Sequence, residues 1–268
     1  MVKVIAISNS QPRWLVRLAV ALTCHALAFF AQAAPGEPNL TNSPAYFAIV
    51  AEKNLSAART RYLADTNNTE AAWHLGRACF DRAEFAANSA QRASLANEGI
   101  AVGRTLVANA PKLAAAHYYL AMNLGQLART KSVGALALVS EMEPLFTTAA
   151  ALDAPFDFAG ANRCLGLLYR DAPVWPASLG SRVKARQHLL RAAEIAPQYP
   201  ENHLNLVETF LKWSEPNNAQ RAWKNFTDTL PVARTNLTGQ AWAASWADWE
   251  YRRAAAEVRL HELRKNTK

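Results

Sequence analysis

Glycine is scarce in this chain, long β-branched runs are few, and no purely apolar segment is long enough to cross a bilayer. Only 10 of the 268 residues are glycine, whereas Ala, Leu, Arg and Glu, which favour helices, are abundant. The scarcity of β-branched runs disfavours strands. A membrane helix needs about 20 predominantly apolar residues, and no apolar run reaches that length. The composition predicts an all-α chain with no transmembrane span in the mature protein.

Sequence patterns typical of enzymes and metal sites are also missing. The six histidines show no metal-binding spacing, since His261-Glu262 is not followed by a second histidine, and no Cys-x-x-Cys occurs. No Gly-rich phosphate loop, nucleophile elbow or close carboxylate pair is present. Ser181 and Lys184 match Ser-x-x-Lys, but the Ser-Asp-Asn and Lys-Thr-Gly partners of that chemistry are absent. Ser181 is better explained as a helix cap, so we expect no catalysis, cofactor or metal.

Positive charge is concentrated at the two ends of the chain. Lysine and arginine exceed aspartate and glutamate by 29 − 21 = 8. Three of the basic residues lie within residues 1–33, and residues 251–268 hold six basic and two acidic residues. The body between these ends is nearly neutral, so it lacks the basic face that a nucleic-acid-binding protein needs. We therefore expect no nucleic-acid partner.

Residues 1–33 have the features of a cleavable signal peptide. The basic residues Lys3, Arg13 and Arg17 precede an apolar run from Leu18 to Phe30. Ala31-Gln32-Ala33 then provides small residues where a signal peptidase would cut. This order predicts cleavage near Ala33 and a periplasmic protein. Lipid attachment at Cys24 is the weaker alternative, because Leu22 and Thr23 fit poorly the small-residue pattern that precedes a lipidated cysteine.

Two cysteines remain after such cleavage, Cys79 and Cys164. Each lies in the middle of a predicted helix among apolar residues, which favours buried free thiols. An oxidising compartment would permit them to pair, and the sequence leaves that alternative open.

The mature chain divides into three parts. Residues 34–44, rich in proline and asparagine, are predicted to form a flexible segment. Residues 45–250 form a helical repeat domain, and residues 251–268 form a basic C-terminal helix end and tail. Within the domain we expect a polar loop over residues 81–98. A short helix over Val133–Glu141 is expected to be separate from a second one over Phe146–Leu152.

One helical pattern recurs four times, with its leucine at positions 75, 120, 165 and 206. The copies are Ala72–Gly76, His117–Ala121, Asn162–Gly166 and His203–Val207. Ala-Pro breaks separate them, and their leucines are 45, 45 and 41 residues apart. These residues resemble tetratricopeptide repeats (TPRs), in which the first helix carries Leu-Gly and the second ends at a proline. The resemblance implies an all-α solenoid whose repeats are longer than the usual ~34 residues.

A narrower resemblance covers roughly residues 45–230. It rests on four motifs between residues 152 and 202: a Leu-Asp-Ala-Pro turn, an Arg-x-Leu-Gly segment, an Asp-Ala-Pro-x-Trp-Pro loop and an Ala-Pro-x-Tyr-Pro-Glu-Asn turn. In these the chain resembles the T-component family of TRAP-type solute transport. The resemblance implies a non-catalytic, exported, TPR-like protein that associates with a periplasmic substrate-binding subunit. The alternative is a general envelope-assembly adaptor that binds peptides or proteins in its concave groove.

The repeat register predicts which side chains face that groove. The expected positions are Trp73, Arg77, Tyr118, Met122, Arg163, Leu167, Leu204 and Glu208, with Arg170 one turn beyond. Arginine forks match carboxylates, so the groove is a candidate site for a small carboxylate ligand or an acidic peptide. For Arg163 the alternative is a structural pair with Asp157 or with a carbonyl at a helix end.

Two tryptophan features are also open to two interpretations. Trp175 lies in a Pro-x-Trp-Pro loop, where it either contacts a partner or, as we favour, packs against the solenoid. Trp242, Trp246 and Trp249 cover one face of the last predicted helix, Ala241–Leu263. This stripe favours a capping helix on the open end of the solenoid over a ligand cage.

Overall fold

The computed structural model describes residues 43–266, which form ten helices and no strand. In chain order they are α2 (Pro44–Ala64), α3 (Thr69–Glu84), α4 (Ser89–Asn109), α5 (Ala114–Ala128), α6 (Ala135–Leu152), α7 (Phe156–Asp171), α8 (Arg182–Ile195), α9 (Pro200–Lys212), α10 (Pro216–Asn236) and α11 (Gln240–Asn266). The predicted signal peptide and Cys24 lie outside the described residues.

Side-chain caps fix where several helices begin. Ser43 Oγ accepts a hydrogen bond from Tyr46 N at 3.2 Å, and Asn88 Oδ1 accepts one from Gln91 N at 2.9 Å. Ser181 Oγ accepts one from Lys184 N at 3.3 Å. These bonds satisfy amide groups that have no partner inside the helix. The cap predicted for Ser181 is therefore confirmed.

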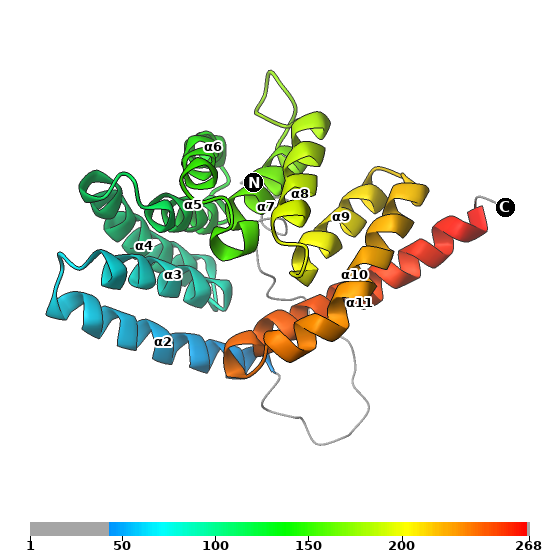
Figure 1. The fold of residues 1–268 in the computed structure, drawn as a ribbon. Helices are drawn as coiled ribbons and strands as arrows, with labels where there is room; N and C mark the ends of the chain where they lie inside the picture. Colours follow the sequence, from blue (N-terminus) through cyan, green and yellow to red (C-terminus); the bar gives the residue numbers. More distant parts are fainter. Residues whose placement is uncertain (1–42, 267–268) are drawn as a thin grey trace, which may run out of the picture.

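Helices α3 to α10 form four antiparallel pairs that follow one another in an arch (Figure 1). Each pair consists of an inner helix (α3, α5, α7 or α9) and the outer helix that follows it. The recurring leucines are all buried: Leu75, Leu120, Leu165 and Leu206. The predicted TPR-like solenoid is confirmed.

A histidine stabilises the turn before two of the inner helices in the same way. His117 Nε2 lies 2.8 Å from Pro111 O, and His203 Nε2 lies 2.8 Å from Pro197 O. Both histidines are buried and six residues beyond the proline. The recurrence of these histidines thus reflects the packing of the repeat rather than ligand binding.

Two outer helices differ from the expectation. The polar loop predicted over residues 81–98 shrinks to the short connection between Glu84 and Ser89. The two helices predicted on either side of Pro144 are one continuous helix, α6. Met142 and Phe146 are fully buried on its inner face, and this packing carries the helix through the proline.

Helix α6 is also the one described helix that is long and apolar enough to cross a membrane. Its 18 residues have a mean hydropathy of 1.2 and include Glu141 and Glu143. It packs between α5 and α7 in the solenoid, where its inner face is buried.

The first turn of α7 contains a left-handed kink. Asp157, Phe158 and Ala159 have φ angles of 51°, 55° and 62°, a region that residues with a Cβ atom rarely adopt. Arg163 stabilises the kink, because its guanidinium donates to the Phe158 carbonyl at 3.1 Å and to Asp157 Oδ2 at 3.1 Å. Asn202 of α9 donates to the same Phe158 carbonyl at 3.1 Å.

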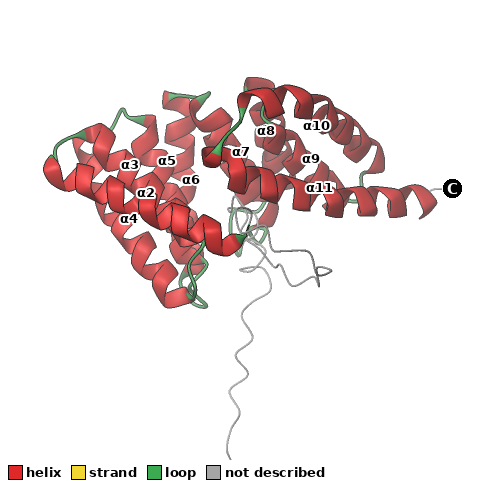
Figure 2. Cartoon of the chain, turned by 90° about the horizontal axis from the view of Figure 1, so that it is seen from below, coloured by secondary structure: helices red, strands yellow, loops and turns green. Residues whose placement is uncertain are grey.

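The two terminal helices cover the concave side of the arch. Figure 2 shows α2 and α11 approaching each other there. Gln240 Nε2, at the start of α11, donates to the Tyr46 hydroxyl, near the start of α2, at 2.6 Å. Helix α11 packs on α9 and α10, so it covers the last repeat as a capping helix does. It does so from the concave side.

Candidate functional site

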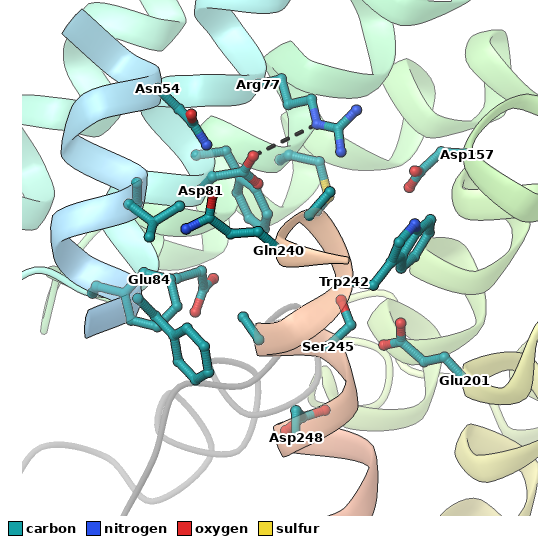
Figure 3. A pocket seen from close by; sticks show the side chains of 18 of the residues that line it. Asn54, Arg77, Asp81, Glu84, Asp157, Glu201, Gln240, Trp242, Ser245 and Asp248 are labelled. Atoms are coloured by element: carbon teal, nitrogen blue, oxygen red, sulfur yellow. Dashed lines mark ion pairs between the residues drawn. The ribbon is translucent and has the colours of Figure 1, made fainter. Parts of the chain in front are cut away.

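A pocket of about 530 Å³ lies between the concave side of the arch and the two terminal helices. Its walls come from α2, α3, α5, the first turn of α7, the α8–α9 turn, α9 and the first turns of α11 (Figure 3). This volume is within the range of small-molecule sites. Because α11 forms one wall, both ends of the described chain are needed to build the pocket.

Acidic side chains dominate the polar lining. Five carboxylates line the pocket against one guanidinium, that of Arg77; the carboxylates are Asp81, Glu84, Asp157, Glu201 and Asp248. Arg77 Nε lies 3.6 Å from Asp81 Oδ2 one turn further along α3, and each side chain keeps about half of its surface accessible, 51% and 48%. The pair is drawn as a dashed line in Figure 3.

Three arginines lie behind this lining and neutralise part of it. Arg129 Nη1 contacts both Glu84 oxygens at 3.1 Å. Arg163 Nη2 contacts Asp157 Oδ2 at 3.1 Å, and Arg252 Nη1 contacts Asp248 Oδ2 at 3.2 Å. None of the three lines the pocket itself. Their positive charge is thus separated from the cavity by the carboxylates.

Arg252 serves several acceptors at once. Its guanidinium contacts Glu208 at 2.7 and 2.8 Å, Asn205 Oδ1 at 2.5 Å and Glu201 Oε1 at 3.6 Å, in addition to Asp248. These residues and Arg252 form the α9–α11 ionic cluster. Three carboxylates thus share one buried guanidinium, and the cluster fixes α11 against α9.

Loss of hydration leaves some of these carboxylic acids with raised pKa values. The pKa of Asp248 rises to about 8, chiefly through burial, although Arg252 opposes the rise. The pKa of Asp81 rises to about 6, chiefly through desolvation within the cavity, with Asp157 and Glu84 adding repulsion and Arg77 opposing it. Burial also raises the pKa of Glu84. Burial in the pocket therefore favours the neutral form of these carboxylic acids, and the neighbouring arginines oppose it.

Aromatic rings form much of the remaining wall. Tyr118 is fully buried, and its hydroxyl donates to Asp157 Oδ2 at 2.6 Å. Trp242 lies against Phe158 and Tyr199, with ring centroids 5.7 and 6.2 Å away. Figure 3 shows Trp242 between Asp157 and Glu201 at the edge of the cavity.

Three of the residues predicted for the groove line this pocket: Arg77, Tyr118 and Met122. Trp73 stacks in parallel on Tyr119 and is not part of the lining. The predicted groove residues that line the pocket thus all come from the first two repeats.

The other predicted groove residues have internal partners. Arg163 is buried and makes the structural pair with Asp157 that was the alternative to ligand binding. Arg170 is paired with Asp171 at 2.7 Å and with Thr209 at 3.1 Å. Glu208 belongs to the α9–α11 ionic cluster. In the last repeat α11 thus occupies the concave face that the repeat register assigned to a ligand.

The contributions of α2 and α11 to the pocket were not predicted from the sequence. Asn54, Gln240, Ser245 and Asp248 all line it. The polar Gln240, Ser245 and Asp248 lie at intervals of five and three along α11, beside the tryptophan stripe. This spacing is the one signal in the sequence for a second functional face.

Trp175 is 83% exposed in the α7–α8 loop, and its neighbour Val174 is 70% exposed. The expectation that Trp175 packs against the solenoid is wrong. Hydrogen bonds within the loop, such as Gly180 N to Pro173 O at 2.8 Å, satisfy the backbone without the indole. The loop therefore presents an apolar tip.

Cys79 and Cys164 are buried free thiols, as predicted. Burial raises the pKa of each to about 12, so neither is a reactive thiolate. Within residues 43–266 no group of three His, Cys, Asp or Glu side chains is arranged to hold a metal ion.

Comparison with known proteins supports the fold. A family model described as regulator of microtubule dynamics protein 1-3 matches residues 48–136, about a third of the chain. A thermophilic TPR protein from Thermus thermophilus has a similar structure, with a TM-score of 0.57 and 18% identity over 83% of this chain and 100% of that chain. No curated protein matches the sequence. At this identity the likeness establishes a TPR-like fold alone.

Proposed function

We propose that this chain is a non-catalytic binding protein whose working site is the pocket between the solenoid and its terminal helices. The observation that carries the proposal is the cavity of about 530 Å³, built by helices from both ends of the described chain. Solenoids present concave faces as binding surfaces. Here α11 interrupts that face, which favours a compact ligand over an extended peptide running along the groove.

A pocket-filling variant tests this proposal. Ser245 lines the pocket on α11, and Ser245→Trp would fill the cavity. Ser140, exposed on α6, provides the matched control Ser140→Trp. We expect some compounds in a panel of small periplasmic metabolites to raise the unfolding temperature of the wild type and of the control but not of Ser245→Trp. If every shift persists in Ser245→Trp, the pocket is not the working site.

The finer proposal concerns the partner. On the basis of the sequence resemblance, the partner is a periplasmic substrate-binding subunit of a TRAP-type transport system. The exposed Trp175 tip supports a protein contact, because interfaces are enriched in tryptophan. The microtubule role in the matching family's name is not carried over, since the match stops before α7, α9 and α11, which complete the pocket.

Cross-linking in intact cells followed by affinity capture tests the partner. Trp175→Ala should reduce the capture of a substrate-binding subunit several-fold, whereas Val133→Ala, at an 87% exposed loop position, should not. Capture of a different envelope protein with the same dependence on Trp175 would favour the adaptor alternative. Export is tested separately by fusing residues 1–33 to alkaline phosphatase, which is active only outside the cytoplasm.

A further inference from the structure

We propose that the pocket binds an organic cation, one or more ammonium groups carried on an aliphatic chain, of which an aliphatic polyamine is the simplest example. This inference rests on the proposed function, because it specifies the ligand class of the same pocket. It departs from the carboxylate ligand that the groove arginines favoured. Those arginines, apart from Arg77, are buried against internal partners.

The balance of charge around the cavity is the first argument. Five carboxylates and one guanidinium line the pocket, and three further guanidiniums lie behind it. One of the three, Arg252, is also shared with Glu208, which does not line the pocket. Asp248 holds its proton up to about pH 8, and the four remaining lining carboxylates still outnumber the one lining guanidinium, that of Arg77. A ligand that enters from solvent first meets Asp81 and Arg77, each about half accessible. Deeper in the pocket the charged lining groups are carboxylates alone, which attract a cation and repel an anion.

The state of Asp81 is the second argument. Within the described residues its ion pair is the 3.6 Å contact with Arg77, which is longer than a good charge-assisted hydrogen bond. About half of the Asp81 side chain is accessible, 48%, so a group that enters the pocket can reach it. An ammonium group beside Asp81 would supply what the fold does not.

The shape of the lining is the third argument. Figure 3 shows Asp81 and Glu84 on one side of the cavity, Asp157 and Glu201 on the other, and Asp248 below them on α11. Apolar and aromatic side chains, Met122 and Trp242 among them, complete the lining, and Trp242 lies beside Asp157 and Glu201. Carboxylates on two sides of a cavity with apolar and aromatic lining match a chain of methylene groups with an ammonium at each end.

Arg77 is the one feature of the lining that would suit an anion, and it therefore gives the sharpest test. If the ligand is a cation, Arg77 repels it and competes for Asp81. Arg77→Gln should then tighten binding. If the ligand is a carboxylate, Arg77 is its main partner in the pocket and the same change should abolish binding. The two ligand classes predict opposite signs for one substitution.

The experiment is calorimetric titration of the full chain with spermidine, cadaverine, succinate and a blocked Ala-Lys-Ala peptide. We expect spermidine and cadaverine to bind and succinate not to bind. Asp81→Asn should weaken the binding of spermidine at least tenfold, and Arg77→Gln should tighten it several-fold. At an effective dielectric constant near 20, losing one contact between opposite charges lowers the affinity about tenfold or more.

Matched controls come from ion pairs outside the pocket. Asp228 pairs with Lys224 on α10, and Arg104 of α4 pairs with Glu141 at 3.0 Å. Asp228→Asn and Arg104→Gln should change the affinity for spermidine by less than about twofold, because these pairs are exposed. Unchanged circular dichroism and unfolding temperature confirm that all four variants are folded.

The outcomes separate this inference from the proposed function. Succinate binding that depends on Arg77 overturns the cation and leaves the pocket as the working site. Spermidine binding that is unaffected by Asp81→Asn places the cation elsewhere and also overturns the inference. If no compound binds and no metabolite gives a shift sensitive to Ser245→Trp, both fall. Peptide binding much tighter than that of cadaverine supports the ammonium chemistry and identifies a lysine side chain of a partner as its source.

Discussion

Replacing Arg252 with methionine should release α11 from the solenoid. Methionine keeps the aliphatic part of the side chain but removes a guanidinium that is 3% exposed. Asp248 and Glu201, each 5% exposed, then face each other and Glu208 without their shared cation. Removing one partner of a buried ion pair typically costs about 3–5 kcal/mol.

The apolar contacts of α11 contribute a free energy similar to the loss expected from the ion pair, and this comparison decides whether the helix detaches. Its deeply buried large side chains are Trp249 and Leu260. Full burial of a large apolar side chain contributes about 1.5–3 kcal/mol, so the two contribute about 3–6 kcal/mol together. A loss of about 3–5 kcal/mol therefore offsets most of the apolar anchoring. Helix α11 should detach while α3 to α9 stay folded.

Hydrogen exchange of the backbone amides measures this directly. In Arg252→Met the amides of residues 244–260 should exchange about 100-fold faster or more, while those of α5 keep their protection. The neighbouring Arg253 pairs with Glu250 at the surface, with 40% and 34% of the two side chains exposed. Arg253→Met should cost less than about 1 kcal/mol. If both variants protect α11 equally well, the ionic cluster does not hold the helix and the reasoning fails.

The remaining predictions concern packing, pH and the kink. Gly166→Ala places a methyl group 2.5 Å from Leu189 of α8, and it should lower the free energy of unfolding in urea by about 1–3 kcal/mol. The control Gly76→Ala places its methyl group 3.5 Å from Tyr119, and it should be neutral or stabilise the protein by about 0.5–1 kcal/mol. The native state holds the Asp248 proton up to about pH 8, whereas the unfolded state holds it only to about pH 4. The free energy of unfolding should therefore fall as pH rises between these values, and Asp248→Asn should make this pH dependence weaker. Arg163→Met removes the guanidinium that pairs with the Asp157 carboxylate and donates to the kink, leaving only the neutral donors Tyr118 and Asn202. It should cost about 3–5 kcal/mol by urea unfolding, and a loss below about 1 kcal/mol would show that the kink is stable without the arginine.

The repeat itself could be predicted from the sequence because its signals are local. Ala-Pro turns separate the four units, and the leucines at 75, 120, 165 and 206 mark the inner helices. The cap at Ser181 follows from the same short-range rules. Such features depend on residues within one or two turns of each other.

The pocket could not be predicted because it depends on contacts between distant segments. The tryptophan stripe of α11 indicated a packing face but not its partner. That partner is fixed by Arg252 and Glu208, 44 residues apart, and nothing in either residue alone identifies the other. The left-handed turn at Asp157 could not be predicted from the sequence either, because residues with a Cβ atom rarely adopt this conformation. For Arg163 the local alternative, a pair with Asp157, was the one realised.

The contact between Tyr46 and Gln240 spans 194 residues of sequence, and this sets the order in which the protein matures. Each helical pair buries its leucines against near neighbours, so the pairs can form in turn as the chain is synthesised. The pocket needs the first turns of α11, which emerge after all of the repeats. A nascent chain that ends before Gln240 can be a folded solenoid and yet hold no ligand. The proposed binding site is therefore incomplete until synthesis has reached α11.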